Sequence, residues 1–517
     1  MTGAAGHAST LSQEALVARN TAWNLLGALL PVPVALVCIP LLIGALGVER
    51  FGVLGVAWMV LGYFGMFDFG LAQSTTKFIS AGVSQGDHGR LRALALGSLL
   101  LHAGLGMVGA VVFAVLVPWL SGAVFSMPAP LVAETRSALY WLAASVPAIV
   151  VTAALRGVLE GLQRFDVVNL IRVPASIVNY AGPLVALSFG TGLPLVVAVI
   201  VVSRYVVLAA YALACLNLLP SAPGRAVLRG ADIVRLASYG GWLTASNLVN
   251  PLIIAADRFI IAATVSVAAV AFYVTPYEII TKGWILSASL LAALFPVFSG
   301  MASREPESLH AACRSAQLYL LTIATPPIML VLGGADVLLD WWLGGEFRAE
   351  SATVARLLAL GILVNIVAQV PLTVLNAIGR ADVTAKISAV ELPLYAFAIW
   401  YGAVRYGING VAAVWAVRTT VEAVALFFAA RAVLPRGARA DAAAGPSLAA
   451  SLVLCSFLAA AWLSADVLGE DIPTRLAVLA AMLAALIAWE WRVLLSGDDR
   501  DRFRQLCRRV LVASHVR

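Results

Sequence analysis

Apolar runs of about 20 residues recur along most of this 517-residue chain, and they constrain its fold more than any other feature. Each run is long enough to cross a bilayer as a helix. Only 12% of the residues are charged and 62% are hydrophobic, whereas soluble domains carry about 25% charged residues. A transmembrane β-barrel would instead show short segments of alternating polarity. The chain is therefore predicted to be an all-α polytopic membrane protein.

About 14 transmembrane helices are expected from these runs. Their ranges are 21–46, 51–79, 94–120, 137–161, 172–190, 193–219, 239–264, 267–298, 313–333, 353–378, 386–404, 408–433, 446–467 and 474–495. The first run is too long for the apolar region of a signal peptide, so we expect it to remain as a helix. The five cysteines are scattered without a CxxC pair, which is typical of small buried hydrophobic residues.

The distribution of Lys and Arg between the runs predicts the orientation in the membrane. If the N-terminus is cytoplasmic, most of the 34 basic residues fall in cytoplasmic loops, as the positive-inside rule requires. We therefore expect a protein of the inner (plasma) membrane with both termini in the cytoplasm. The basic C-terminal tail is predicted to lie on the anionic inner leaflet, and we expect no nucleic-acid partner.

The chain also shows signs of an internal duplication. Trp23 and Trp242 each open a long apolar run, and a proline follows in each, Pro33 and Pro251. Six spans per copy would give both copies the same orientation, related by a pseudo-two-fold axis along the membrane normal. The expected parts are an N-terminal six-helix lobe (1–219), a cytoplasmic linker (220–238), a C-terminal six-helix lobe (239–434), an accessory helix pair (446–495) and a basic cytoplasmic tail (496–517).

Ionisable residues inside the apolar runs are the candidate functional residues. Each costs roughly 3 kcal/mol at the centre of a bilayer, so we expect them to face a bundle interior or a wet cavity. Because a guanidinium fits phosphate oxygens bidentately, the bases are predicted to bind an anionic substrate: Arg204, Arg258, Lys282 and Arg418. The acids are predicted to couple transport to a cation: Asp68, Asp257, Glu278 and Glu391.

A structural interpretation of some of these charges remains open. Glu278 and Lys282, like Arg418 and Glu422, are spaced i,i+4, so each pair could neutralise itself on one helix face. Asp68 could equally serve as a hydrogen-bonded residue in helix packing. Arg204 and Arg258 have no such partner at helical spacing and are the stronger candidates for an anion site.

Signals of an enzyme are absent from the sequence. It contains no P-loop, HExxH or GxSxG stretch. The loops predicted on the outer side are too short for the outer domain expected of a membrane glycosyltransferase or a repeat-unit polymerase. We therefore expect a transporter without a cofactor, with H⁺ or Na⁺ as the coupling ion.

Several stretches follow one another in a recognisable order between Arg19 and Val383. They are RNTAWNLLGALLPVPVALVCIPLLIGALGVERFGVLG, MFDFGLAQSTTKFIS, RGVLEGLQRFDVVN, AADRFIIA with AFYVTPYEI, DWWLGGEF and LNAIGRADV. In this order they resemble the polysaccharide-biosynthesis (lipid-linked oligosaccharide) flippases of the multidrug/oligosaccharidyl-lipid/polysaccharide exporter superfamily. The resemblance implies two six-helix lobes arranged in a V plus an extra C-terminal helix pair.

The same resemblance implies a substrate. It is undecaprenyl-diphosphate-linked oligosaccharide, moved from the cytoplasmic to the outer leaflet by alternating access for surface polysaccharide biosynthesis. Membrane lipids, a polysaccharide polymerase and glycosyltransferases are the implied partners of a monomeric flippase. The positions that match the family's functional ones are Asp68, Asp257, Arg258 and Lys282.

Three other functions remain open at this point. A cation-coupled multidrug exporter and a lipid II flippase belong to the same superfamily. A drug exporter should have a cavity dominated by acids, because its guests are cationic. A membrane glycosyltransferase or polymerase would be a different class of protein altogether.

Overall fold

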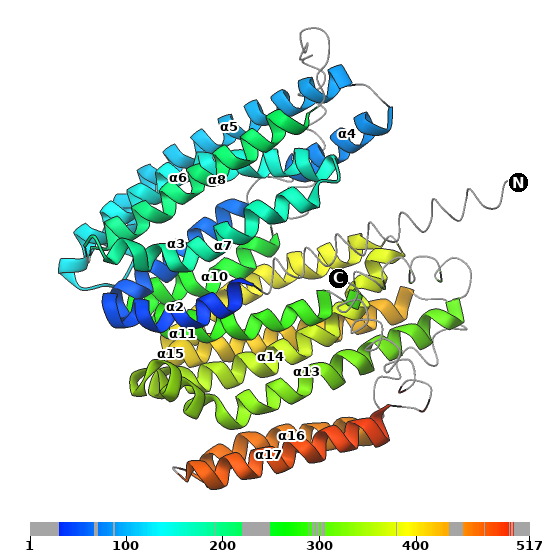
Figure 1. Cartoon of the computed structure of the whole chain (residues 1–517). Coiled ribbons are helices and arrows are strands. Elements are labelled where there is room, and N and C mark those ends of the chain that lie inside the picture. Colours follow the sequence, from blue (N-terminus) through cyan, green and yellow to red (C-terminus); the bar gives the residue numbers. More distant parts are fainter. Residues whose placement is uncertain are drawn as a thin grey trace, which may run out of the picture. The chain divides into compact units, whose positions relative to one another are not determined.

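The computed structural model describes residues 30–66, 71–85, 88–190, 192–219, 249–288, 306–378, 380–433, 448–469 and 471–495, with a few isolated positions between 290 and 301 and at 497 and 500. Every regular element within these ranges is a helix (Figure 1). The prediction of an all-α membrane protein is confirmed.

The helices of the first part of the chain are α2 (Pro31–Leu46), α3 (Val48–Met66), α4 (Leu71–Gln85), α5 (His88–Trp119), η1 (Leu120–Val124), α6 (Ala129–Gly161), α7 (Phe165–Leu187) and α8 (Leu193–Leu218). Those that follow are α10 (Val249–Thr264), α11 (Val267–Ile280), η2 (Thr281–Gly283), α13 (Pro306–Leu343), α14 (Gly345–Ala377), α15 (Ala381–Val433), α16 (Leu448–Val467), α17 (Ile472–Trp489) and η4 (Glu490–Leu494).

Nine helical stretches of the described residues are long and apolar enough to cross a membrane. One of them, Asp382–Ala432, holds two of the predicted spans, because α15 turns back at Gly407. The φ angle there is 59°, a left-handed conformation that glycine adopts without a steric penalty. With α15 counted twice and α2, α3, α10 and α11 once each, every predicted span contains a helix.

Several helices extend beyond the apolar runs that predicted them. The run at 313–333 lies inside α13, which begins at Pro306 and ends at Leu343. Polar turns such as ESLH at the start of α13 carry no apolar signal, yet their backbone continues the same hydrogen-bond ladder. Hydropathy therefore locates each span well and its ends poorly.

The chain divides into two compact units, Met1–Val274 and Thr275–Arg517. The division falls inside α11, so the helix begins in the first unit and ends in the second. The linker predicted at 220–238 lies outside the described residues, and the lobe boundaries predicted on either side of it stay predictions. Each unit is described below by itself.

In the first unit, α6 is the central helix. It packs against α3, α4, α5 and α8. In its most apolar 18-residue stretch 61% of the residues are buried, compared with 22% in α5 and 28% in α8. Glu134 of α6 accepts hydrogen bonds from the Arg50 side chain at 2.9 Å and from the backbone N–H of Leu193 at 2.6 Å. One carboxylate therefore ties α3 and the N-terminus of α8 to the central helix.

The turn between α10 and α11 is hydrogen-bonded to the loop before α6. Ser126 donates its N–H to the Ala262 carbonyl at 2.9 Å and its hydroxyl to the Ala263 carbonyl at 3.0 Å. Its own carbonyl accepts the N–H of Val267 at 3.0 Å. Together with the packing of α10 on α3, these bonds account for the membership of α10 and early α11 in the first unit.

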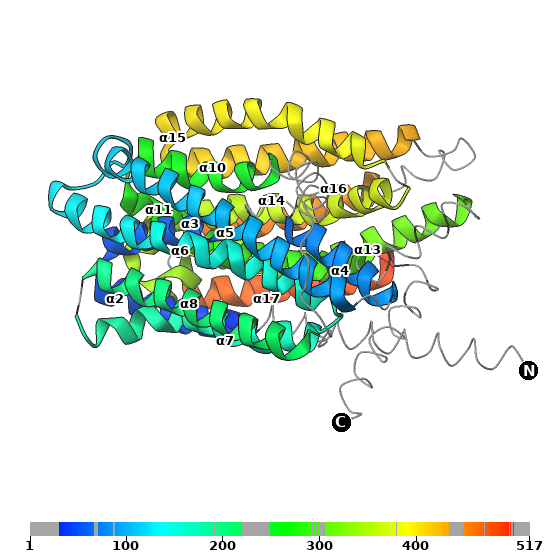
Figure 2. The same ribbon diagram turned by 90° about the horizontal axis from the view of Figure 1, so that it is seen from above.

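In the second unit, α13 and α14 form the centre. α14 packs against α13 on one side and α15 on the other, and the α16–α17 pair packs on α13. Figure 2 shows the two arms of α15 running side by side. The α15 hairpin therefore packs on α14, whereas the accessory α16–α17 hairpin packs on α13.

Candidate functional site

Asp257 is the most buried of the predicted functional residues that the structure describes, with 1% of its surface exposed. Its Oδ2 accepts a 2.8 Å hydrogen bond from the Tyr273 hydroxyl of α11. Its Oδ1 accepts a 2.7 Å bond from the backbone N–H of Arg258, the next residue of α10. Donors on both oxygens compensate the cost of burying a carboxylate. Its coupling to a cation stays a prediction.

Two predicted arginines lie in the first unit. Arg258 is buried on α10. Arg204 lies on α8, and its Nη2 donates a 2.5 Å hydrogen bond to Oδ1 of Asn179 on α7. An amide oxygen carries no formal charge, and no carboxylate among the described residues pairs with Arg204. Arg204 therefore has a neutral partner inside a helix long enough to span a membrane.

Glu278 and Lys282 lie in the second unit at the end of α11 and in η2. The Lys282 Nζ atom is 3.6 Å from Oε2 of Glu278, one turn earlier. The i,i+4 pairing considered from the sequence is therefore present. Because the two charges offset each other, this pair carries little net charge toward an anion.

Arg418 also lies in the second unit, between two carboxylates. Its Nη1 is 3.4 Å from Oε1 of Glu391 on the other arm of α15 and 3.5 Å from Oε2 of Glu422 on its own arm. Its guanidinium carbon lies 5.1 Å from the centre of the Tyr395 ring. The predicted pair Arg418–Glu422 is present, and the structure adds Glu391 to it.

The predicted residues thus gather in different places. Asp257, Arg204 and Arg258 belong to the first unit, and the remaining described ones belong to the second. Asp68 lies outside the described residues. Arg418 and Glu391, which the sequence assigned to different roles, form one ionic cluster.

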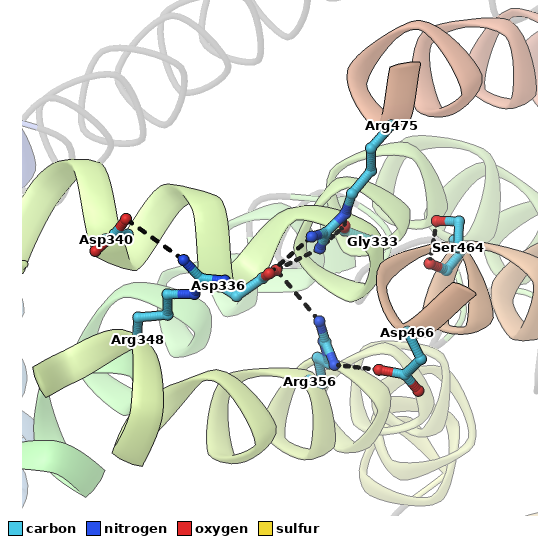
Figure 3. Close-up of polar contacts among 9 residues, drawn as sticks. Gly333, Asp336, Asp340, Arg348, Arg356, Ser464, Asp466 and Arg475 are labelled. Atoms are coloured by element: carbon cyan, nitrogen blue, oxygen red, sulfur yellow. Dashed lines mark hydrogen bonds and ion pairs between the residues drawn. The ribbon is translucent and has the colours of Figure 1, made fainter. Parts of the chain in front are cut away.

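A further cluster, missed from the sequence, joins α13 and α14 to α16 and α17 (Figure 3). Arg475 of α17, 1% exposed, donates its Nε to the Gly333 carbonyl at 2.9 Å and its Nη1 to Oδ2 of Asp336 at 2.7 Å. Its Nη2 donates to Oδ1 of the same carboxylate. Arg356 of α14 donates to that Oδ1 at 3.2 Å and lies 3.5 Å from Oδ1 of Asp466.

We call Asp336, Arg356, Asp466 and Arg475 the accessory clamp, because they hold the α16–α17 pair to α13 and α14. None of these four was among the candidate functional residues, although Arg356 and Arg475 fall at the start of the spans predicted at 353–378 and 474–495. A usable signal existed: Arg475 follows the start of α17 by less than one turn, and Asp336 is the lone acid in the apolar stretch before Leu339.

No group of three or more His, Cys, Asp or Glu side chains in the described part of the chain could hold a metal ion. Three kinds of group are available for binding. The first unit holds an arginine with a neutral partner and a buried aspartate that directly precedes a second arginine in the sequence. The second unit holds an arginine between two carboxylates.

Comparisons with known proteins identify relatives by sequence. A family model described as polysaccharide biosynthesis protein matches residues 17–302. A relative from Shigella flexneri named "Putative O-antigen transporter" is 27% identical over 429 residues, which are 79% of this chain and 96% of the relative.

Solved structures give the fold. A multidrug-resistance MATE family transporter of the MOP superfamily, in an inward-facing conformation, superposes with a TM-score of 0.65 at 17% identity, covering 80% of this chain and 94% of that one. A mutant of the Vibrio cholerae MATE transporter VcmN gives 0.57 at 20% identity, covering 83% and 98%. A MOP superfamily transporter from Pyrococcus furiosus, described as having a binding pocket of reversed polarity, gives 0.56 at 16% identity, covering 80% and 95%.

Proposed function

Because the chain belongs to the polysaccharide biosynthesis protein family, we propose that it carries an undecaprenyl-diphosphate-linked oligosaccharide from the cytoplasmic to the outer leaflet by alternating access. The described helices are those of a multi-pass membrane protein, and their fold is that of solved transporters of the MOP superfamily. Its Shigella flexneri relative carries a name that refers to O-antigen, a surface polysaccharide.

The observation that carries the proposal is the hydrogen-bond partner of Arg204. Inside a membrane-spanning helix, its guanidinium is held by an amide oxygen rather than by a carboxylate. An arginine within a membrane span is expensive when no carboxylate pairs with it, so its presence there favours a role in binding. A diphosphate offers the planar, bidentate acceptor that an arginine fork fits.

The parts of this cargo suit different surroundings. The polyprenyl chain is apolar and stays in the bilayer, so the protein has to pass only the diphosphate and the sugars. We assign the diphosphate to Arg204 and Arg258, and coupling to H⁺ or Na⁺ to Asp257 and Asp68. Lys282 and Arg418 have carboxylates beside them and are weaker candidates for a dianionic group.

The surrounding cell biology follows from the same proposal. The cargo is made by glycosyltransferases on the cytoplasmic leaflet and consumed by a polymerase on the outer one. We therefore propose the inner membrane as the location, with both termini in the cytoplasm.

The test uses a strain in which the chromosomal gene is deleted and restored on a plasmid. Arg204→Ala is expected to abolish most surface polysaccharide and to accumulate lipid-linked oligosaccharide, because the phosphates lose their positive partner. Arg204→Lys should retain part of the activity. Arg405→Ala removes an exposed arginine from the α15 turn and serves as the matched control with normal output.

A purified assay separates transport from cell physiology. Proteoliposomes containing a fluorescent undecaprenyl-diphosphate oligosaccharide are treated with dithionite, which bleaches only the outer leaflet. Wild-type protein should expose the lumenal half of the probe to bleaching, and the Arg204→Ala protein should not. Normal polysaccharide output from Arg204→Ala, Arg258→Ala and the double variant, at normal protein levels, would overturn the assignment.

A further inference from the structure

A chain of three uncharged polar side chains joins the segment after α11 to α14. η2 packs on α14, and Trp284 directly follows η2. The Trp284 Nε1–H donates a 2.8 Å hydrogen bond to Oδ1 of Asn365 on α14. Gln369, one turn further along α14, donates its Nε2–H to the same oxygen at 3.2 Å. We call Trp284, Asn365 and Gln369 the amide site, and all three belong to the second unit.

The partners of this oxygen fix the orientation of both amides. An indole nitrogen can only donate a hydrogen bond, so the atom of Asn365 that faces Trp284 has to be the oxygen. The atom of Gln369 that faces this oxygen has to be the amide nitrogen, because two oxygens cannot form a hydrogen bond without a proton between them. The Nδ2 amide of Asn365 and the Oε1 carbonyl of Gln369 are therefore the groups left for another partner.

Neither of these groups is used within the part of the chain that the structure describes. No residue there accepts a hydrogen bond from Nδ2 of Asn365 or donates one to Oε1 of Gln369. Neither atom is among the fully buried, unpartnered polar atoms of those residues, so both reach the accessible surface. The amide site thus presents one donor and one acceptor together.

The surroundings of the amide site are polar although they belong to membrane-spanning helices. α14 is one of the apolar helices long enough to cross a membrane. Glu278 and Lys282, on the turns before Trp284, are 27% and 40% exposed. Ionised groups and amides are costly against acyl chains, so this edge of the second unit is expected to face water. A ligand that reaches it from there is a polar one.

A sugar ring matches this arrangement better than an ion does. Each sugar hydroxyl can donate and accept, so one hydroxyl can accept from the Asn365 amide while its neighbour donates to the Gln369 carbonyl. The C–H groups on one face of a sugar ring pack against the negative face of an aromatic ring, and the half-buried Trp284 indole offers one. The two neutral amides supply no charge that would attract a phosphate or a cation.

From this combination of donor, acceptor and aromatic ring we propose that the amide site binds a sugar of the transported oligosaccharide. The proposal rests on the proposed function for the identity of the cargo and on the second unit alone for its geometry. It gives the sugars a binding site of their own, distinct from the arginines assigned to the diphosphate. Such a site makes the protein select the glycosylated lipid over the bare carrier lipid.

The experiment measures equilibrium binding of two fluorescent lipids to the full-length protein in nanodiscs, with empty nanodiscs subtracted. One is the undecaprenyl-diphosphate oligosaccharide of the transport assay, and the other is undecaprenyl diphosphate without sugars. The ratio of their dissociation constants is the sugar preference. We expect the wild type to bind the glycosylated lipid about tenfold more tightly, because only that lipid offers hydroxyls to the amide site.

Variants connect the sugar preference to the amide site. Gln369→Met keeps the length of the side chain and the Trp284 bond but removes the acceptor, and should lower the preference to about twofold or less. Asn365→Asp keeps the oxygen that Trp284 binds, removes the donors and should have the same effect. The charge that it adds acts on both diphosphate lipids and cancels in the ratio. Thr373→Val is the matched control, because its hydroxyl on the next turn of α14 already donates to the Gln369 backbone carbonyl at 2.7 Å.

Several outcomes overturn the proposal. Equal affinity of the wild type for both lipids would refute the sugar site. An unchanged preference in Gln369→Met and Asn365→Asp, with a lower thermal midpoint, would make the three residues a structural contact between η2 and α14. If one of these variants fails to fold, the other decides.

The same measurement separates this proposal from the proposed function. Arg204→Ala should weaken binding of both lipids alike, since both carry the diphosphate. Insensitivity of both lipids to Arg204→Ala would refute the phosphate assignment and leave the sugar preference measurable. Wild-type protein that binds neither lipid would refute the proposed function and the sugar site with it, whereas equal binding of both lipids refutes the sugar site alone.

Discussion

The accessory clamp and the Glu391–Arg418–Glu422 cluster use the same residue types to opposite effect. Both lie in the second unit, and both place arginine between two carboxylates. The clamp has two arginines for its two acids, and Arg475 directs its donors at the Gly333 carbonyl and at both oxygens of Asp336. The other cluster has one arginine for two acids, and both Glu391 oxygens lack a hydrogen bond from the described residues.

This difference shows that charge burial alone does not identify a functional residue. A bidentate arginine–carboxylate pair with further acceptors recovers much of its desolvation cost and holds helices in one geometry. A carboxylate left with an ion-pair contact but no hydrogen bond retains the capacity to bind something else. By this criterion the clamp is structural, whereas the Glu391–Arg418–Glu422 cluster leaves one carboxylate without a hydrogen bond from the described residues.

The largest expected effect is that of Arg475→Ala. Removing one partner of a buried ion pair costs about 3–5 kcal/mol, because the remaining charge stays desolvated. Asp336 would keep only Arg356, and the Gly333 carbonyl would lose its side-chain donor. We expect a sharply lower thermal midpoint in detergent, measured by fluorescence-detected gel filtration. A midpoint equal to that of the wild type would remove the distinction between the two clusters.

A smaller loss of thermal stability is expected from Gly333→Ala. The added Cβ would lie 2.2 Å from the end of the buried Leu479 side chain and 3.1 Å from the Ala461 carbonyl, so α13 could no longer approach both accessory helices. Overpacking of this kind costs about 1–3 kcal/mol. The same thermal assay measures it, with Gly334→Ala as control, since the Cβ added there meets nothing closer than 4.0 Å. Equal midpoints for the two variants would contradict the close approach.

Asp466→Asn tests the exposed edge of the clamp. This carboxylate is 60% exposed and lies 3.5 Å from Arg356, which also contacts Asp336. Exposed ion pairs contribute about 0.2–1 kcal/mol and weaken with salt. A small drop in midpoint that disappears at high salt is expected, whereas a loss as large as that of Arg475→Ala would mean that the clamp has no exposed edge.

The smallest effect on stability is expected from Glu391→Gln, and this variant tests the comparison most directly. Arg418 keeps Glu422 as its partner, and the substitution removes a buried charge that no hydrogen bond satisfies. Asp336→Asn makes the same carboxylate-to-amide change in the clamp and should cost far more. Similar losses for the two variants would show that the Glu391 carboxylate is as structural as that of Asp336.

Interactions within one helix could be predicted from the sequence. The spacing of Glu278 with Lys282 and of Arg418 with Glu422 indicated both pairs, because residues four apart share a helix face. The nine long apolar helices of the described residues followed from hydropathy for the same local reason, whereas the span predicted at 51–79 covers α3 and the start of α4. These features depend on periodicity, which the sequence displays directly.

Contacts between helices could not be predicted in the same way. Glu391 reaches Arg418 only because α15 reverses at Gly407, and Arg475 meets Asp336 across 139 positions. The bond from Arg204 to Asn179 and that from Tyr273 to Asp257 likewise depend on how two helices are rotated against each other. No spacing rule encodes that rotation, which is set by the packing of all neighbouring side chains.

Ser126 has a consequence for the order in which the protein is made. Its hydroxyl bonds to a carbonyl 137 positions later in the chain, so the ribosome must release the α10–α11 turn before this bond can form. Multi-helix proteins generally fold from the N-terminus during synthesis. Here α2 to α8 have to remain in the membrane unfinished until a segment translated later completes them. A truncated product ending near residue 219 is therefore expected to be a substrate for quality-control proteases rather than a stable half-transporter.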